Sequence, residues 1–261
     1  MIVDTHCHLD DDRYKDDLED VLKRAKEADV TKIIIPGADI HTLKRAVKIV
    51  ESYDDIYFAV GVHPYDIDNY DRLYLEEFIM HPKCVGVGEC GLDYYRLPKD
   101  EDEKDKIKKR QKEVFIDQID LANKYKKPLI IHIREASIDS KEILEKYSKY
   151  GGVLHCFNAN RELLNLSKIG FYFGIGGVVT FKNAKKLVAV LPDIPLEKIV
   201  LETDGPYLTP EPFRGKRNEP AYTRYVLNRV SEILNIDKKE LENRFFDNSA
   251  RLFKGIIGNN I

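Results

Sequence analysis

The chain has 261 residues, of which 43% are hydrophobic and 33% are charged, and its formal net charge is −3. This length suits one large α/β domain, so we expect a single domain over residues 1–261. The slightly acidic total excludes a surface that is basic all over and coats nucleic acid non-specifically. Nucleic acid stays open as a substrate, because divalent cations bound in a site can reverse the local sign of the charge.

Apolar runs with the pattern of strands alternate with helical patterns along the chain, which is typical of βα units and a parallel sheet. Eight strands are predicted, near residues 2–6, 32–36, 56–61, 84–89, 128–132, 152–155, 170–174 and 198–203. Eight parallel strands with helices between them form a (β/α)8 TIM barrel, and we predict this α/β fold class. The active site of such a barrel lies at the carboxyl ends of its strands.

The clearest amphipathic helix is predicted at residues 104–127, where apolar residues recur at helical spacing. After the eighth strand, residues 208–218 follow no regular pattern, and loops of this length in compact domains are often functional. The last two predicted helices, at residues 221–234 and 237–253, are expected to cover the barrel.

Six of the predicted strands end in a histidine or a carboxylate. His6 and His8 are one residue apart, so both side chains would leave the strand on the same side and reach one ion. The residues at the ends of the other five strands are His63, Glu89, His132, His155 and Asp204. A lone histidine in such a place is more often a hydrogen-bonded polar residue than a ligand. Coincidence at so many strand ends is hard to sustain, so the pattern predicts a metal centre.

These ligand-type residues exceed what a single ion needs, so we predict two divalent metal ions. Glu89, on a middle strand, would bridge them, as two-metal hydrolases require. One ion would take His6, His8, Glu89 and Asp204, and the other would take Glu89, His132 and His155. Imidazole with carboxylate suits zinc, manganese or iron, whereas carboxylate with water suits magnesium, so Mg, Mn and Zn all stay open.

Three further residues lie beside this ligand set. His63 is needed by neither ion, so it is free to donate a hydrogen bond to a substrate oxygen. Glu202, two residues before Asp204, is expected to orient a ligating imidazole, with direct ligation or catalysis as the alternative. Asp4 precedes His6 by the same spacing, and it either orients an imidazole or is a structural carboxylate of the strand.

The ligand-type residues lie in strings that resemble the TatD family of metal-dependent deoxyribonucleases, in the amidohydrolase superfamily. These strings are DTHCHLD at 4–10, GVHP at 61–64, GECGLDYY at 88–95, IH at 131–132, VLHCF at 153–157, LETD at 201–204 and RGKRNEP at 214–220. The resemblance implies a TIM barrel with two metals at the residues named above, and it implies that His63 lies near the scissile phosphate. Departures at Cys90, residues 133–135 and residues 158–160 touch no expected ligand and concern substrate preference.

Phosphodiester hydrolysis requires an activated water and stabilisation of charge on the reacting oxygens, and two metal ions supply both. Asp204 is expected to take the proton of the water, and the predicted catalytic residues are Asp204, Glu89, His63 and Glu202. Arginine matches phosphate with a bidentate fork, so the predicted phosphate contacts are His63, Arg134, Arg214, Lys216 and Arg217. We predict a nuclease that removes nucleotides from an end of single-stranded DNA.

Three alternatives stay open at this stage. The same site suits hydrolysis of the ester of D-aminoacyl-tRNA, an activity of some TatD-like proteins. A small-molecule amidohydrolase acting on C–N bonds is the second, although many such enzymes bridge their metals with a carboxylated lysine where this chain offers Glu89. A non-catalytic metal-binding scaffold is the third, and it would be expected to lack a ligand.

The expected compartment follows from the termini and the cysteines. The sequence shows no signal peptide, and its longest uncharged stretch, residues 169–181, is too short to span a bilayer. The cysteines show no paired spacing, which favours a reducing compartment, and strand alternation directs Cys7, Cys90 and Cys156 away from the metals. We expect a cytoplasmic monomer whose partner is its nucleic-acid substrate.

Overall fold

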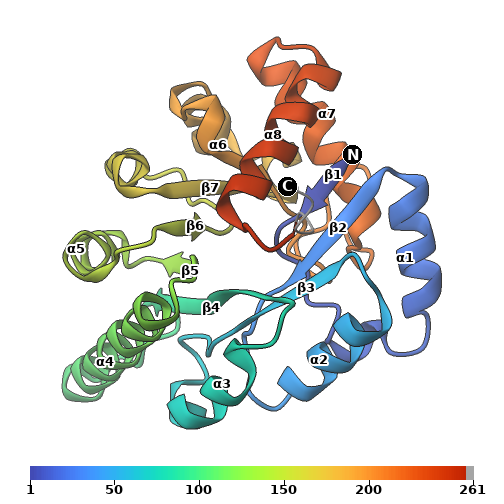
Figure 1. Cartoon of the computed structure of the whole chain (residues 1–261). Coiled ribbons are helices and arrows are strands. Elements are labelled where there is room, and N and C mark those ends of the chain that lie inside the picture. The colour runs from blue at the N-terminus through green and yellow to red at the C-terminus, as the bar shows by residue number, and fades with distance from the viewer. Residues whose placement is uncertain (257–261) are drawn as a thin grey trace.

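The computed structural model describes residues 1–256, and its strands form one parallel sheet in the order β1 to β8 (Figure 1). The strands are β1 (Ile2–Asp4), β2 (Val30–Ile35), β3 (Ile56–Val60), β4 (Cys84–Asp93), β5 (Leu129–Arg134), β6 (Gly152–Leu154), β7 (Phe171–Ile175) and β8 (Ile199–Leu201). Backbone hydrogen bonds from Thr5 to Leu201 and from Asp204 to His6 close the sheet between β8 and β1. The predicted (β/α)8 TIM barrel is confirmed.

Helices follow most of the strands and pack outside the barrel. They are α1 (Leu18–Glu27), α2 (Leu43–Ser52), α3 (Arg72–Ile79), α4 (Glu101–Tyr125), α5 (Ser137–Tyr147), α6 (Lys185–Val190), α7 (Thr223–Leu234) and α8 (Lys238–Leu252). A 3-10 helix, Arg161–Ile169, stands between β6 and β7. None of the helices in residues 1–256 combines the length and the apolar character that crossing a membrane requires.

Several predicted boundaries differ from those observed, and two of the differences have a clear local cause. β4 continues four residues past its predicted end at Glu89, because Cys90–Asp93 pair with Ile131–Arg134 of β5. Gly91 and Asp93 interrupt the apolar pattern of this extension, so the pattern does not reveal it. α4 begins at Glu101 rather than at residue 104, because the Asp100 carboxylate accepts the backbone N–H of Glu103 and caps the helix there.

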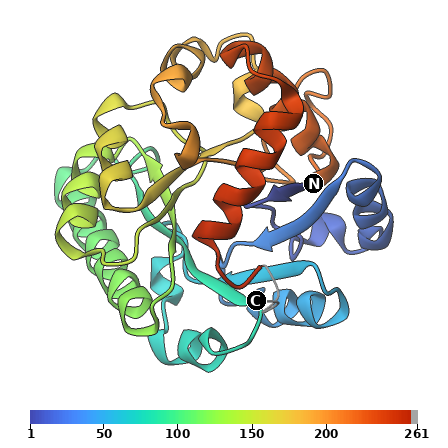
Figure 2. The same ribbon diagram turned by 45° about the horizontal axis from the view of Figure 1, so that its top comes forward.

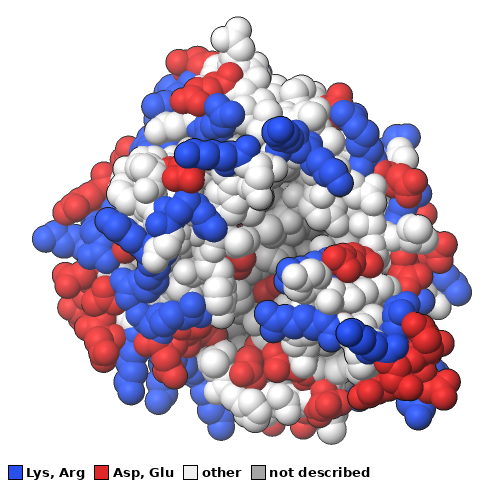
Figure 3. Space-filling model, turned by 180° about the vertical axis from the view of Figure 1, so that it is seen from behind, with Lys and Arg blue, Asp and Glu red and all other residues white. Residues whose placement is uncertain are grey.

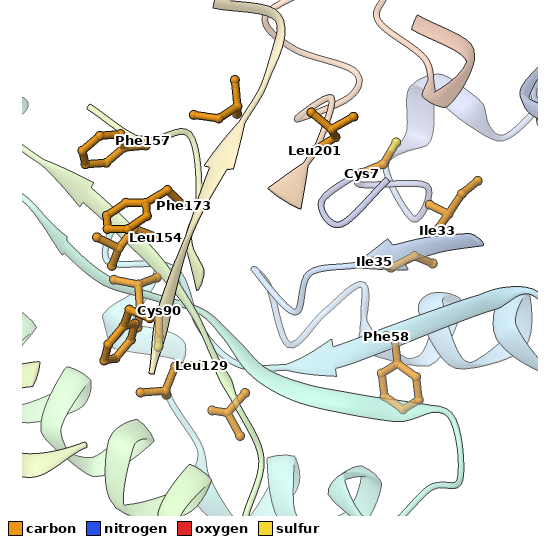
Figure 4. Packing of buried hydrophobic residues seen from close by; sticks show 14 of the residues in the cluster. Cys7, Ile33, Ile35, Phe58, Cys90, Leu129, Leu154, Phe157, Phe173 and Leu201 are labelled. Atoms are coloured by element: carbon orange, nitrogen blue, oxygen red, sulfur yellow. The ribbon is translucent and has the colours of Figure 1, made fainter. Parts of the chain in front are cut away.

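Two apolar layers hold the barrel together. The inner layer consists of strand residues that point to the axis, among them Ile34, Ile130 and Val200, and it is closed by Leu252 and Phe253 at the end of α8. α8 therefore lies across the amino-terminal end of the barrel (Figure 2). The outer layer lies between strands and helices, and Figure 4 shows part of it. With the amino-terminal end covered by α8, a site for a substrate is expected at the carboxyl ends of the strands.

Gly91 in β4 is a position where the fold requires glycine. Its φ is +141°, and a Cβ there would lie 2.0 Å from the carbonyl oxygen of His132. We expect Gly91→Ala to lower the free energy of unfolding by about 2–4 kcal/mol, since steric overlap adds to backbone strain. Urea unfolding measures this loss. Gly215→Ala is the control, because Gly215 has a φ of +83° but nothing within 4 Å of its Cβ position. An equal loss in both variants would show that only backbone strain acts.

Candidate metal centre

The side chains predicted as ligands meet at the carboxyl ends of the strands. Figure 3 views this face, which is hollowed at its centre and carries Lys and Arg around the rim. His6 and His8 follow β1, His155 follows β6, and Asp204 follows β8, whereas Glu89 and His132 lie within β4 and β5. His6, Glu89 and His155 are buried, whereas His8, His132 and Asp204 are partly exposed.

Glu89 lies at the middle of this cluster, and its two carboxylate oxygens face different histidines. Oε2 lies 3.3 Å from Nε2 of His6 and 3.6 Å from Nε2 of His8. Oε1 lies 2.9 Å from Nδ1 of His132 and 3.1 Å from Nε2 of His155. The carboxylate therefore separates the imidazoles into two pairs, one on each of its oxygens.

Asp204 completes the first pair. Its Oδ1 lies 3.6 Å from Nε2 of both His6 and His8. Burial by itself raises the pKa of Asp204, but the hydrogen bond with His8 and the charges of nearby histidines lower it below its usual range. Asp204 is therefore a carboxylate at neutral pH, as a metal ligand or a general base must be.

The residues present fit a metal centre. Donor atoms that each lie about 2.1 Å from one ion, at tetrahedral or octahedral angles, are about 3.0–3.4 Å apart. The separations of 3.1–3.6 Å between Glu89 or Asp204 and the imidazoles of His6, His8 and His155 are close to this range. Both ring nitrogens of His6 are buried without a hydrogen-bond partner, a costly arrangement that a bound cation would relieve. Imidazole and carboxylate donors suit a divalent transition metal.

The second ring nitrogens of His132 and His155 each face a further carboxylate. Nε2 of His132 lies 2.8 Å from Oδ2 of Asp93, and this contact holds the ring with its Nδ1 toward Oε1 of Glu89. Nδ1 of His155 faces Oε1 of Glu202 at 3.6 Å, and that oxygen also accepts the N–H of Cys156 at 2.6 Å. Such carboxylate–imidazole contacts fix the tautomer and the orientation of a ligand.

Asp93 is a residue of the centre that the sequence reasoning missed. Burial raises its pKa, but the hydrogen bonds that it accepts, the largest effect among them from His132, together outweigh this and leave the pKa below the usual range. Its signal was strand alternation, because Glu89, Gly91 and Asp93 lie on the same side once β4 extends to Asp93. The predicted strand end at Glu89 concealed it.

Asp4 is the structural carboxylate of the two readings that the sequence left open. It accepts the Thr203 N–H at 3.0 Å, the Thr203 hydroxyl at 2.6 Å and the His6 N–H at 3.2 Å. These bonds join β1 to the segment after β8, and no imidazole is among its described hydrogen-bond partners. Alternation fails here because β1 ends at Asp4, before His6 and His8.

His63 lies beside Glu89, and its neutral ring is protonated on the nitrogen that faces Glu89. Its Nδ1 accepts the backbone N–H of Tyr65 at 3.1 Å, so the neutral ring carries its proton on Nε2. That nitrogen lies 3.6 Å from Oε1 of Glu89. Burial lowers the pKa of His63 to about 4, which keeps the ring neutral at pH 7. An Nε2–H points a hydrogen-bond donor at the centre and offers no lone pair to a metal.

The predicted phosphate-binding arginines occupy different places. Arg134 lies at the mouth, with its guanidinium 3.6 Å from the centroid of the Tyr95 ring. Arg217 instead forms a bidentate ion pair with Asp17 at 2.6 and 2.8 Å. Arg214 donates to the carbonyl of Thr209 and is not among the residues that line the two pockets at the mouth.

The structure therefore does not bring Arg214 and Arg217 to the centre. Asp17 is 200 positions away from Arg217 in the chain, so its pairing was invisible in the sequence. Lys216, from the same loop, has its ammonium group 5.5 Å from the centroid of the Phe213 ring. It lines neither of the two pockets that open from the centre. The basic composition of residues 214–217 drew attention to this loop, but it does not show which of its charges are paired within the protein.

Two pockets open from the centre, with volumes of about 450 and about 730 Å³. We call them the first and the second pocket. The residues common to both are His132, His155, Asp204 and Tyr207. The first pocket lies over the β1–β4 side, and the second lies over the β5–β8 side. Cys156, expected to point away from the centre, lines the second pocket because its φ of +44° breaks the alternation after β6.

A barrel with buried imidazoles and carboxylates at the carboxyl ends of its strands has the architecture of a metal-dependent hydrolase. Comparisons with known proteins agree. The family model described as TatD related DNase matches residues 3–254. The chain therefore belongs to the TatD family of metal-dependent hydrolases, and the resemblance seen in its motifs is confirmed.

Individual relatives span nearly all of the chain. The uncharacterized metal-dependent hydrolase YabD of Bacillus subtilis (strain 168) is 43% identical, over 97% of this chain and 99% of its own length. YcfH of Escherichia coli (strain K12), also named as an uncharacterized metal-dependent hydrolase, is 38% identical, over 97% and 96%. The crystal structure of the TatD homolog YJJV from Escherichia coli K12 superposes with a TM-score of 0.88 at 29% identity, covering 97% of this chain and 98% of that one.

Proposed function

We propose that the protein hydrolyses phosphodiester bonds of single-stranded DNA from an end, at a centre that holds two divalent ions. The observation that carries this proposal is the position of Glu89, whose two oxygens face two separate pairs of imidazoles. A bridging carboxylate between two ions is the arrangement of hydrolases that clamp both the attacking and the leaving oxygen. The family description, TatD related DNase, supports a phosphodiester of DNA as the bond.

Divalent ions at this centre supply acidification of water and neutralisation of charge on the reacting oxygens. In the proposed assignment His6, His8, Glu89 and Asp204 hold one ion, and Glu89, His132 and His155 hold the other. Asp93 and Glu202 keep His132 and His155 oriented. Asp204, ionised at neutral pH, accepts the proton of the attacking water, and the Nε2–H of His63 donates to a phosphoryl oxygen.

Exposed aromatic side chains at the mouth favour a single strand as the substrate. Tyr207 is 48% exposed, and Tyr65 is 39% exposed. Both line the first pocket, and Tyr207 also lines the second. Unpaired bases stack on such rings whatever their sequence, whereas bases in a duplex are already stacked on one another.

One substrate panel tests the proposal against its alternatives. Purified protein with magnesium, manganese or zinc is assayed on single-stranded DNA, RNA, D-aminoacyl-tRNA and bis-para-nitrophenyl phosphate. We expect cleavage of DNA and of the small phosphodiester. Faster hydrolysis of D-aminoacyl-tRNA would identify a deacylase, and inactivity on all phosphodiesters would favour an amidohydrolase acting on C–N bonds.

His63→Ala tests the proposed donor to the phosphoryl oxygen. We expect the variant to keep its metal content and to lose about 10²-fold in turnover, as enzymes do when one charge-stabilising donor is removed. Elemental analysis and kcat on single-stranded DNA measure the two effects. His41→Ala is a matched control, because His41 is exposed and lines neither pocket. Loss of metal from His63→Ala would show that His63 is a ligand.

A further inference from the structure

The two pockets differ sharply in the charge of their walls. Six carboxylates line the first pocket, with one cationic side chain, Arg96; they are Asp10, Asp11, Asp39, Asp66, Glu89 and Asp204. Among the described residues, the second pocket has one lining carboxylate, Asp204, and three cationic side chains, Arg134, Lys185 and Lys186. Asp204 belongs to both pockets and Glu89 to the centre, so four carboxylates of the outer wall, Asp10, Asp11, Asp39 and Asp66, make most of the contrast.

The walls of the second pocket suit a nucleotide with its phosphate. Lys185 and Lys186 begin α6 and are exposed, so their ammonium groups are free to follow a phosphate along the rim. Below them Phe157 and Leu187, both buried, give the pocket an apolar floor. Cationic groups over an apolar surface provide the two contacts that a single strand needs, one for its backbone and one for its bases.

The first pocket is unsuited to a phosphate beyond the centre. Asp39 and Asp66 face its outer part, and Arg96 is its one cation among the described residues. Oδ1 of Asp10, a residue only 5% exposed, is buried without a partner at the wall of this pocket. Carboxylates at the wall of a pocket repel phosphate oxygens, and those that reach its surface accept hydrogen bonds from hydroxyl groups.

We propose that the strand lies across the centre in one direction only. The chain of phosphates runs over Lys185 and Lys186 in the second pocket, and the terminal nucleoside enters the first pocket with its free hydroxyl toward the carboxylates. This inference rests on the proposed nuclease function. The charge of the first pocket then explains why only terminal nucleotides are removed. The acidic pocket repels a further phosphate, so it does not admit an internal stretch of the strand.

The double variant Lys185→Ala/Lys186→Ala tests the phosphate path. We expect KM for a short single-stranded DNA to rise about 10-fold or more. The slope of the logarithm of the DNA association constant against the logarithm of the salt concentration should shrink by about 1.4, because two phosphate contacts are lost. Hydrolysis of bis-para-nitrophenyl phosphate should not change, because this substrate has no second phosphate. Lys23→Ala/Lys26→Ala on α1 removes the same charge from exposed positions outside both pockets and should leave both activities unchanged.

Terminal phosphates test the acidic pocket. A phosphate on the attacked end of the oligonucleotide should slow wild-type cleavage at least about 10-fold, and Asp39→Asn/Asp66→Asn should reduce this difference. If wild-type protein cleaves DNA but the lysine variant keeps its KM and salt slope, the inference is overturned and the nuclease function stands. If wild-type protein hydrolyses no phosphodiester, both are overturned. Lys185→Gln/Lys186→Gln, with thermal melting, controls for any loss of folding.

Discussion

Replacing Glu89 with glutamine is expected to lower kcat by more than about 10³-fold, or at least about 4 kcal/mol of transition-state stabilisation. Each oxygen of Glu89 serves a different pair of imidazoles, and an amide offers a ligand-type oxygen to only one of them. The variant should also retain fewer divalent ions per chain than the wild type. Elemental analysis and turnover on single-stranded DNA measure the two effects.

Glu202→Gln is the matched control for this variant. Oε1 of Glu202 accepts the N–H of Cys156 and faces His155, so an amide keeps part of its positioning role. A loss of about 10- to 100-fold is expected, as for other residues that orient a ligand. Equal losses in the two glutamate variants would contradict a bridging role for Glu89, as would full metal content in Glu89→Gln.

Replacing Asp204 with asparagine is expected to lower kcat about 10²- to 10⁴-fold, the range for loss of a general base. Asparagine is the appropriate substitution because Asp204 has a φ of +58°, a left-handed conformation that asparagine also tolerates. The backbone bonds from Asp204 N–H to His6 and from Tyr207 N–H to Asp204 should therefore persist. The loss then reports the carboxylate and not the fold.

Metal titration separates the two roles of Asp204. If excess metal restores turnover to the wild-type level, Asp204 is a ligand only and another group accepts the proton. If turnover stays low with the centre saturated, the carboxylate acts as the base. Because the pKa of Asp204 lies below its usual range, it stays ionised as the pH falls through the neutral region. The acid limit of wild-type activity should therefore arise from protonation of the imidazoles and not from Asp204.

The cluster of imidazoles around Glu89 was predictable because it depends on a local rule. Parallel strands of one barrel bring their carboxyl ends to one face, so residue type and strand order suffice to gather His6, His132 and His155 around Glu89. The fold class followed from the same alternation of strand and helix patterns. Both conclusions hold without knowing any contact between remote segments.

Strand boundaries and side-chain directions depended on pairing between strands. The extension of β4 to Asp93 exists because β5 pairs with it, and this extension places Asp93 against His132. Asp4 turns to Thr203 because barrel closure brings the segment after β8 beside β1. The alternation of side chains within one strand cannot predict either feature, because each depends on pairing with another segment.

The sequence by itself determined the barrel and the cluster of imidazoles and carboxylates at one of its faces, because strand order and residue type carry that information. Only the tertiary structure decided which charges act at the mouth. Arg217 is neutralised by Asp17, which lies 200 positions away, whereas Lys185 and Lys186 line the second pocket. A charge acts on a substrate only where no opposite charge is close to it, and that depends on contacts between segments far apart in the chain.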